Sequence, residues 1–187
     1  MSEHDKSDMV TIPHKFLDRR INPETQTLII GTFNPAADKN PATFFYSRGR
    51  NYFWRLLPTA LKEKEKDMSK KTAEEKNIFI GRHKIDFIDL ISEVRVEKNK
   101  GASYADDYID RRVTQWRNVI QEIDRLSALK LVCFTRKTFS GITRLKETIG
   151  EVQKHCENKT IVFKYLITPA RSYSKAKQAE WDDFFNT

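Results

Sequence analysis

Four short apolar runs recur along the chain and constrain its fold more than any other feature of the sequence. Each run is shorter than an ordinary helix, and the first is bounded by Gly and Pro, so each is predicted to be a buried strand. The segments between them have helical patterns. Strands that alternate with helices are typical of an α/β fold, here a three-layer αβα arrangement with a mostly parallel four-stranded central sheet. The expected strands are residues 28–33, 85–91, 129–135 and 160–168.

Five helices are expected around these strands. Apolar residues at three- and four-residue spacing over 109–123 favour a long helix, with Ser103 as its N-cap. Pro58 is expected to bend or end the first part of the first helix. Gly81 and Gly150 are expected to stop the second and fourth helices. The predicted helices are residues 51–61, 72–79, 103–126, 139–149 and 175–185.

The length of the chain suits a single domain. Its 187 residues are enough for one substantial core. Residues 1–9 are polar and predict a flexible tail, and residues 10–187 are predicted to form one domain. Within that domain, residues 10–24 read as an irregular lead-in and residues 62–71 as a solvated run of charges.

The charge balance of the chain favours a polyanionic partner. Lys and Arg number 34 against 26 Asp and Glu, which gives a formal net charge of +8 and a pI near 9.4. Such a balance is typical of proteins that bind nucleic acid or an acidic membrane surface, although surplus Lys also serves plain solubility. In residues 44–57 Arg lies among aromatic residues, and this mixture of ring faces and cations favours nucleic acid.

Several other classes of protein are not supported by the sequence. Cys133 and Cys156 are the only cysteines, and the four histidines lack ligand spacing, so we expect no metal and no cofactor. No apolar stretch has the length of a signal peptide or membrane span, so we expect no membrane association and a cytoplasmic, nucleoid-associated location, or a nuclear one in a eukaryote. Gly-rich phosphate loops and a Gly-x-Ser-x-Gly elbow are absent, which argues against nucleotide triphosphatases, dehydrogenases and common hydrolases.

Polar residues follow three of the expected strands at their C-terminal ends. These are Asn34, residues 89–95 and residues 168–173. In open α/β sheets functional residues cluster outside these ends. Simpler interpretations exist for each: Asn34 can cap a turn, and Asp89, although it forms a tempting acid pair with Asp86, is expected to cap its own loop.

Two motifs resemble the uracil-DNA glycosylase superfamily. The first is Gly-Thr-Phe-Asn-Pro at residues 31–35, followed after an aromatic-rich gap by Asn-Tyr-Phe-Trp at 51–54; the second is Leu-Ile-Thr-Pro-Ala-Arg-Ser at 166–172. The order and spacing of these motifs are most similar to those of the mismatch-specific (G·T/U) and hypoxanthine-DNA glycosylase branches. The resemblance extends over the chain from about residue 11 onward. The resemblance implies a uracil-DNA-glycosylase-like fold, no metal or cofactor, and a monomeric enzyme whose partner is DNA with a damaged or mismatched base.

The resemblance also implies roles for individual residues. Asn34 would be catalytic by holding the attacking water, and Thr168 matches the small polar catalytic residue of the second motif. The backbone N–H of Phe33 would donate to the base, Tyr46 would stack on it, and Asn51 would bond its edge or brace the pocket. The residues expected to contact DNA, at phosphates or in the vacated stack, are Arg48, Arg50, Arg171, Ser172, Tyr173 and Lys175.

The chain departs from the family pattern in both loops. Ala36 replaces the second Gly of the first motif, and the second motif lacks the additional Ser or His of stronger uracil enzymes. Ser172 stands where a bulky apolar wedge is expected, so Arg171 or Tyr173 would fill the duplex instead. Asn51 is equally suited to a plain helix N-cap.

These observations together predict a monofunctional DNA glycosylase that flips and excises a deaminated or mismatched base, with uracil or hypoxanthine foremost, in base excision repair. A monofunctional mechanism is expected because Asn34 supplies a carboxamide and no strand end carries a Lys for a Schiff base. Two alternatives remain open. One is a catalytically weak or inactive nucleic-acid-binding module of the same fold, and the other is an enzyme acting on a free nucleoside or nucleotide.

Overall fold

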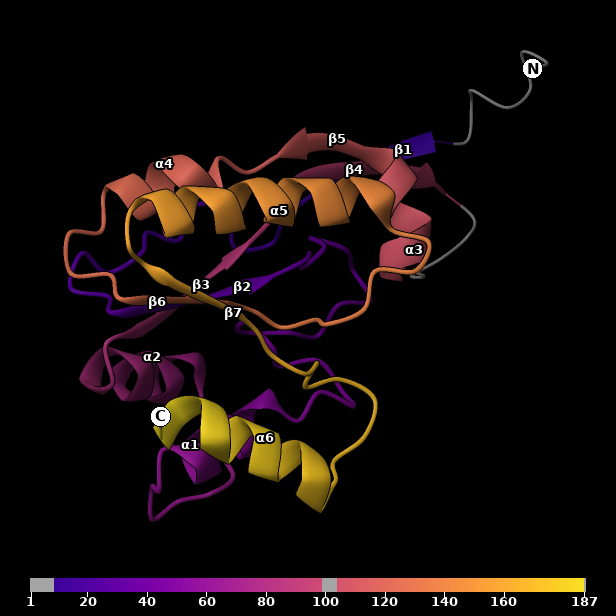
Figure 1. The fold of residues 1–187 in the computed structure, drawn as a ribbon. Coiled ribbons are helices and arrows are strands. Elements are labelled where there is room, and N and C mark those ends of the chain that lie inside the picture. Colours follow the sequence, from indigo (N-terminus) through magenta and orange to yellow (C-terminus); the bar gives the residue numbers. More distant parts are fainter. Residues whose placement is uncertain (1–8, 99–103, 187) are drawn as a thin grey trace.

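The computed structural model of the chain describes residues 9–98 and 104–186, and its centre is a parallel sheet (Figure 1). Each expected strand is present near its predicted position. Neighbouring strands are in register, so that Ile30 lies between Ile88 and Phe134. In spatial order the four strands of this sheet are β3 (Ile85–Asp89), β2 (Thr27–Gly31), β6 (Leu131–Phe134) and β7 (Val162–Tyr165).

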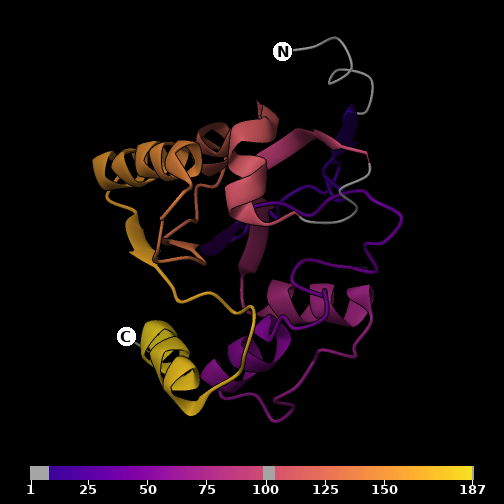
Figure 2. The same cartoon turned by 90° about the vertical axis from the view of Figure 1, so that its right-hand side faces the viewer.

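Buried side chains cover this sheet on both faces. Leu28 and Ile30 of β2 join one hydrophobic cluster, and Ile29 between them joins the other, because successive side chains of a strand point to opposite sides. The predicted three layers are therefore confirmed, as the two views at right angles show (Figures 1 and 2). The first cluster is completed by α4 (Val119–Asp124) and α5 (Thr143–Asn158), and the second by α1 (Phe53–Ala60), α2 (Ala73–Arg82) and α6 (Lys175–Asn186).

A second, antiparallel sheet lies beside the first and was not predicted. Its strands within the described residues are β1 (Met9–Pro13), β4 (Ile91–Glu97) and β5 (Val113–Trp116), in the order β1-β4-β5. The prediction of an irregular lead-in is wrong over its first residues, because β1 pairs with β4 along its whole length. Its partner lies about 80 residues further along the chain, so no local pattern announces the pairing.

The long helix predicted over 103–126 is wrong. The described part of this segment contains α3 (Asp106–Ile109), a 3₁₀ turn, β5 and α4, and Ser103 lies outside the described residues. Val113 and Trp116 have helical spacing, yet they pair with β4 in the second sheet. A new helix begins at Asn118, whose side chain accepts the backbone N–H of Gln121 at 3.0 Å. Tertiary pairing has overridden local spacing here.

Pro58 lies inside α1 rather than at its end. It has no N–H to donate to the carbonyl oxygen of Trp54, four residues earlier in the helix. That oxygen instead accepts the backbone N–H of Met68 at 2.7 Å. The charged segment after the helix therefore folds back and replaces the hydrogen bond that proline removes.

Gly81 and Gly150 also lie inside helices, so neither stops one as predicted. A glycine ends a helix when it adopts the left-handed conformation, and neither of these two does. The fourth predicted helix is displaced as well, because α5 spans Thr143–Asn158. Its beginning is set by Asp110, whose buried carboxylate accepts the backbone N–H of Leu145 at 2.7 Å.

Two further predictions concern the N-terminal tail, residues 1–9, and the single domain over residues 10–187. Of the expected tail, Met9 begins β1 and residues 1–8 lie outside the described residues. The single domain over residues 10–187 stays a prediction. Among the helices of the described chain, none combines the length and the hydropathy needed to cross a membrane.

Candidate active site at the strand ends

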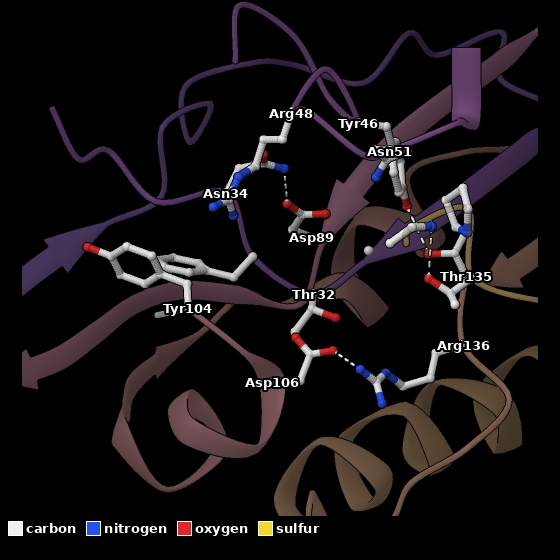
Figure 3. A pocket seen from close by; sticks show the side chains of 15 residues that line it. Thr32, Asn34, Tyr46, Arg48, Asn51, Asp89, Tyr104, Asp106, Thr135 and Arg136 are labelled. Atoms are coloured by element: carbon white, nitrogen blue, oxygen red, sulfur yellow. Dashed lines mark hydrogen bonds and ion pairs between the residues drawn. The ribbon is translucent and has the colours of Figure 1, made fainter. Parts of the chain in front are cut away.

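A pocket of about 200 Å³ opens at the C-terminal ends of the parallel strands. At about 30 Å³ per water this holds a handful of waters or one small ring system. Figure 3 shows its side chains converging from loops that lie far apart in the sequence. Six of the predicted site residues line it, namely Phe33, Asn34, Tyr46, Arg48, Asn51 and Thr168. The other lining residues are Gly31, Thr32, Asp89, Tyr104, Asp106, Thr135, Arg136, Pro169 and Ala170.

Gly31 forms the floor of the pocket by its lack of a side chain. A Cβ atom at this position would lie 2.2 Å from Asp89 Oδ1 and 3.0 Å from the Tyr46 hydroxyl. Only glycine therefore allows the carboxylate and the phenol to approach the end of β2 this closely. The sequence motif begins with Gly31 for this steric reason.

Asn34 is held in one orientation by Asp89. Its side-chain Nδ2 donates to Asp89 Oδ2 at 2.7 Å, and its backbone oxygen accepts the N–H of Lys15 at 2.7 Å. Because a carboxylate accepts only, the amide nitrogen faces Asp89 and the amide oxygen faces away from it. Among the described residues Asn34 Oδ1 has no hydrogen-bond partner, so it is available to accept from a molecule in the pocket.

Asp89 is in turn bonded to His14, a residue that sequence analysis did not select. His14 Nε2 lies 2.8 Å from Asp89 Oδ2, and both side chains are buried. The backbone N–H of Phe16 donates to His14 Nδ1 at 3.0 Å, which leaves the ring proton on Nε2, where it is donated to Asp89. The prediction that Asp89 caps its own loop is therefore wrong, because its side chain bonds His14 and Asn34 instead. No sequence spacing links positions 14, 34 and 89.

Tyr46 is partly buried and packed on one face. Its ring stacks on Phe53 at 4.3 Å between centroids, and its hydroxyl lies 3.1 Å from Thr135 Oγ1. Burial, together with the nearby charge of Asp89, raises the pKa of the Tyr46 phenol well above 10. The phenol is therefore neutral at physiological pH, and the ring face away from Phe53 is the one left for a ligand.

The two motif segments are locked to each other through their backbones. Tyr52 donates its N–H to the Pro169 oxygen at 2.9 Å, and Asn51 forms an isolated β-bridge with Ala170. The Asn51 side-chain oxygen accepts the backbone N–H of Phe53 at 3.0 Å. This bond leaves the Asn51 amide nitrogen as the group that can donate into the pocket. Asn51 thus both braces the turn and lines the cavity.

Thr168 and Phe33 offer further donors at the mouth of the pocket. Thr168 Oγ1 accepts the Ala170 N–H at 3.3 Å, so its own hydroxyl proton is free to be donated elsewhere. The backbone N–H of Phe33 has no partner within the described part of the chain. Its ring lies 5.9 Å from the His14 ring and 6.1 Å from that of Tyr104.

The far wall of the pocket is an ion pair. Arg136 donates to the carboxylate of Asp106 (Figure 3). The Thr32 side chain is a further hydrogen-bond partner of this carboxylate. Burial raises the pKa of the Asp106 carboxyl, and the charge of Arg136 opposes this rise. Sequence analysis missed both residues, because they come from a wrongly predicted helix and from the loop after β6.

The remaining predicted DNA contacts are not part of the pocket lining. They are Arg50, Arg171, Ser172, Tyr173 and Lys175, and none of them lines the cavity. The loop that carries three of these residues, 171–173, is braced by Lys177, whose Nζ donates to the Ala170 and Ser172 oxygens at 3.0 and 2.7 Å. Arg55 lies over the Tyr173 ring, 3.9 Å from its centroid, and is a further cation on this face.

The described residues contain no evident metal-binding site. In the ranges 9–98 and 104–186, no group of three or more His, Cys, Asp or Glu side chains has the geometry to hold a metal ion.

The parallel sheet, its two covering layers and the pocket at the strand ends define an α/β fold of the uracil-DNA-glycosylase kind. The solution NMR structure of a putative uracil DNA glycosylase from Methanosarcina acetivorans is similar, with a TM-score of 0.60 and 19% identity over 88% of this chain and 91% of that one. At this identity the similarity establishes the fold and confirms the predicted fold class. No family model matches the sequence, and no curated protein matches it.

Proposed function

We propose that the chain is a monofunctional DNA glycosylase that hydrolyses the N-glycosidic bond of a flipped base. The observation that carries this proposal is the convergence of Asn34, Asn51 and Thr168 on one pocket at the strand ends, with the Asn34 amide fixed by Asp89. The fold similarity to a putative uracil DNA glycosylase supports the same class of activity. The partner is then DNA, and the chain acts where DNA is, in the cytoplasm or nucleus, as a monomer.

The pocket groups suit the two demands of this reaction. Bond cleavage needs a positioned water and a way to stabilise negative charge on the departing base. The free oxygen of Asn34 can accept a hydrogen bond from the water. The Phe33 backbone N–H, the Asn51 amide nitrogen and the Thr168 hydroxyl are donors, and donors are what a base anion needs.

The donor pattern favours a base that carries a ring carbonyl. Asn51 presents only N–H groups to the pocket, because its oxygen is engaged with the backbone of Phe53. An N–H group recognises the carbonyl oxygen of uracil or hypoxanthine and is mismatched with an exocyclic amino group. A deaminated base is therefore favoured over its amino parent, and the Tyr46 ring face opposite Phe53 would stack on it.

The face around the pocket suits the DNA backbone. Arg48 is a cation in the pocket lining, and Arg50, Arg171 and Lys175 are cations that lie within five residues along the chain of the lining residues Asn51 and Ala170. Tyr173, whose ring lies under Arg55, would fill the space that the flipped base vacates. Ser172 is held by Lys177 through its backbone oxygen and would bring its hydroxyl near a phosphate.

A strand-cleavage assay tests the proposal. Labelled duplexes with a single uracil, hypoxanthine, xanthine or G·T mismatch are incubated with the protein, and abasic sites are then cleaved with alkali. We expect breaks at uracil or hypoxanthine that are lost in Asn34→Ala. Binding without breaks on any substrate would instead support a silent DNA-binding module, and base release from free nucleosides alone would support a nucleoside hydrolase.

A further inference from the structure

We propose that Asp89 is a second catalytic group, which accepts the proton of the attacking water and supplies negative charge beside the sugar cation, and that His14 positions it. This inference rests on the proposed function and deepens it. An amide such as Asn34 can orient a water but cannot take its proton at neutral pH. Some other group at the pocket must therefore do so.

The geometry of the Asp89 carboxylate divides its two oxygens between two tasks. Oδ2 accepts from both Asn34 Nδ2 and His14 Nε2, at 2.7 and 2.8 Å. Oδ1 has no hydrogen-bond partner among the described residues and lies over Gly31 at the pocket floor. In Figure 3 one oxygen of Asp89 is joined to Asn34, and the other is directed toward the middle of the pocket. Asp89 Oδ1 and Asn34 Oδ1 are thus two unengaged acceptors on residues that line the same pocket.

His14 keeps Asp89 in this orientation without neutralising it. The Phe16 N–H donates to Nδ1, so this nitrogen is an acceptor and the ring proton that faces Asp89 is on Nε2. The ring is buried between Phe16, Phe33 and Phe45, with centroids 5.9 to 6.0 Å away. Neither hydrogen-bond partner of the buried carboxylate is a cation. A buried negative charge is costly unless hydrogen bonds or a cation stabilise it. A carboxylate that has hydrogen bonds but no cationic partner can stabilise a positive charge that develops on the substrate during the reaction.

The proposed step balances as follows. The C1′–N bond breaks and its electron pair leaves with the base, so that the sugar becomes an oxocarbenium-like cation facing Asp89. Water, held by Asn34 Oδ1, adds to C1′, and one of its protons passes to Asp89 Oδ1. The carboxylic acid then returns that proton to solvent or to the departing base anion. The products are the free base and an abasic sugar.

Single-turnover kinetics, combined with a measurement of duplex affinity, test the proposed roles of Asp89 and His14. We expect Asp89→Asn to lower the excision rate about a hundredfold or more while duplex affinity changes little, since proton transfer to a placed base contributes on that scale. His14→Ala should lower the rate less than Asp89→Asn does. The matched control is His155→Ala, which breaks a similar His–carboxylate pair with Asp124 (2.9 Å) on the surface of α5 and should leave excision unchanged.

A charge-specific readout separates catalysis from mere support of the fold. Duplexes carrying a cationic pyrrolidine abasic analogue or a neutral tetrahydrofuran one have the same phosphates. The wild type should bind the cationic duplex about tenfold tighter or more, because unit charges a few ångströms apart interact strongly in a partly buried site. Asp89→Asn should abolish this preference, and His155→Ala should keep it. The wild-type preference can be measured even if the variant does not fold.

The outcomes also distinguish this inference from the proposed function. Excision by the wild type that persists in folded Asp89→Asn, or equal binding of both analogues by the wild type, overturns the role of Asp89 and leaves the glycosylase standing. No excision of any base overturns the proposed function and the proton transfer that rests on it. In that case an Asp89-dependent preference for the cationic duplex still supports the placement of its charge.

Discussion

The backbone N–H of Arg171 donates to the carbonyl oxygen of Arg50 across 2.9 Å, and both residues have left-handed backbones, with φ of 75° and 60°. Non-glycine residues adopt this conformation at a cost, so the two loops are held in a particular arrangement that sets the backbones of two arginines side by side. Adjacent cations repel each other unless an anion lies between them. We infer that this pair is arranged for a DNA phosphate.

Removing the charge of Arg171 should therefore weaken DNA binding in a salt-dependent way. Arg171→Ala is expected to lower affinity for duplexes of any sequence and to reduce the slope of log affinity against log salt by about 1. Fluorescence anisotropy over a series of salt concentrations measures both. Arg125→Ala, which removes an exposed arginine paired with Glu122 on α4, is the control and should leave the slope unchanged. An unchanged slope in Arg171→Ala would contradict the phosphate contact.

The Tyr46 ring should matter more to excision than to binding. Because stacking on a flipped base is worth about 1–3 kcal/mol, Tyr46→Ala is expected to lower the single-turnover rate about tenfold or more with a small change in duplex affinity. Tyr46→Phe keeps the ring and loses only the hydroxyl contact to Thr135, so it should retain most of the activity. If Tyr46→Ala lowers affinity and rate equally at every salt concentration, the stacking role is wrong.

Gly31→Ala should destabilise the protein and inactivate the pocket. The new methyl group would overlap Asp89 Oδ1, and forcing an extra carbon into a packed site costs about 1–3 kcal/mol. Urea unfolding measures the free energy, and the strand-cleavage assay measures activity. The matched control is Gly150→Ala, where nothing lies within 4 Å of the new carbon inside α5, and it should stabilise the protein by about 0.5–1 kcal/mol. Equal effects of the two substitutions would contradict the steric argument.

The buried thiol of Cys156 should make stability fall at alkaline pH. Burial, with the neighbouring charge of Glu157, raises the pKa of this thiol to about 11 from an ordinary value of 9.0. The unfolded chain ionises first, so this contribution to stability is present below pH 9 and is lost as pH rises toward 11.

The lost stability amounts to about 1.4 kcal/mol for each pH unit within that window. In Cys156→Ala this contribution is absent, so the gap in unfolding free energy between wild type and variant should narrow as pH rises from 9 to 11. Urea unfolding at a series of pH values checks it. A gap that stays constant over the window would show that the thiol titrates alike in both states.

The sequence by itself determined the parallel sheet and the segments that form the pocket. Residues 28–33 are apolar, short and followed by Asn-Pro, and such a run has few alternatives to a buried strand with a polar residue at its C-terminal end. The same reasoning located the strand before Asp89 and the turn at Thr168. Parallel strands bring their C-terminal ends to one edge, so Asn34 and Thr168 were expected to lie close together, and the family resemblance added Asn51 to them.

Only the tertiary structure decided which residues hold Asn34 and which segments pair in the second sheet. His14 reaches Asp89 because β1 and β4 pair across some 80 residues, and Val113 and Trp116 become a strand because β4 offers a free edge. Hydrogen bonds between distant backbones and buried polar side chains leave no period in the local sequence. Burial patterns can therefore be read from the chain, whereas the partners of buried polar groups are fixed only when the chain has folded.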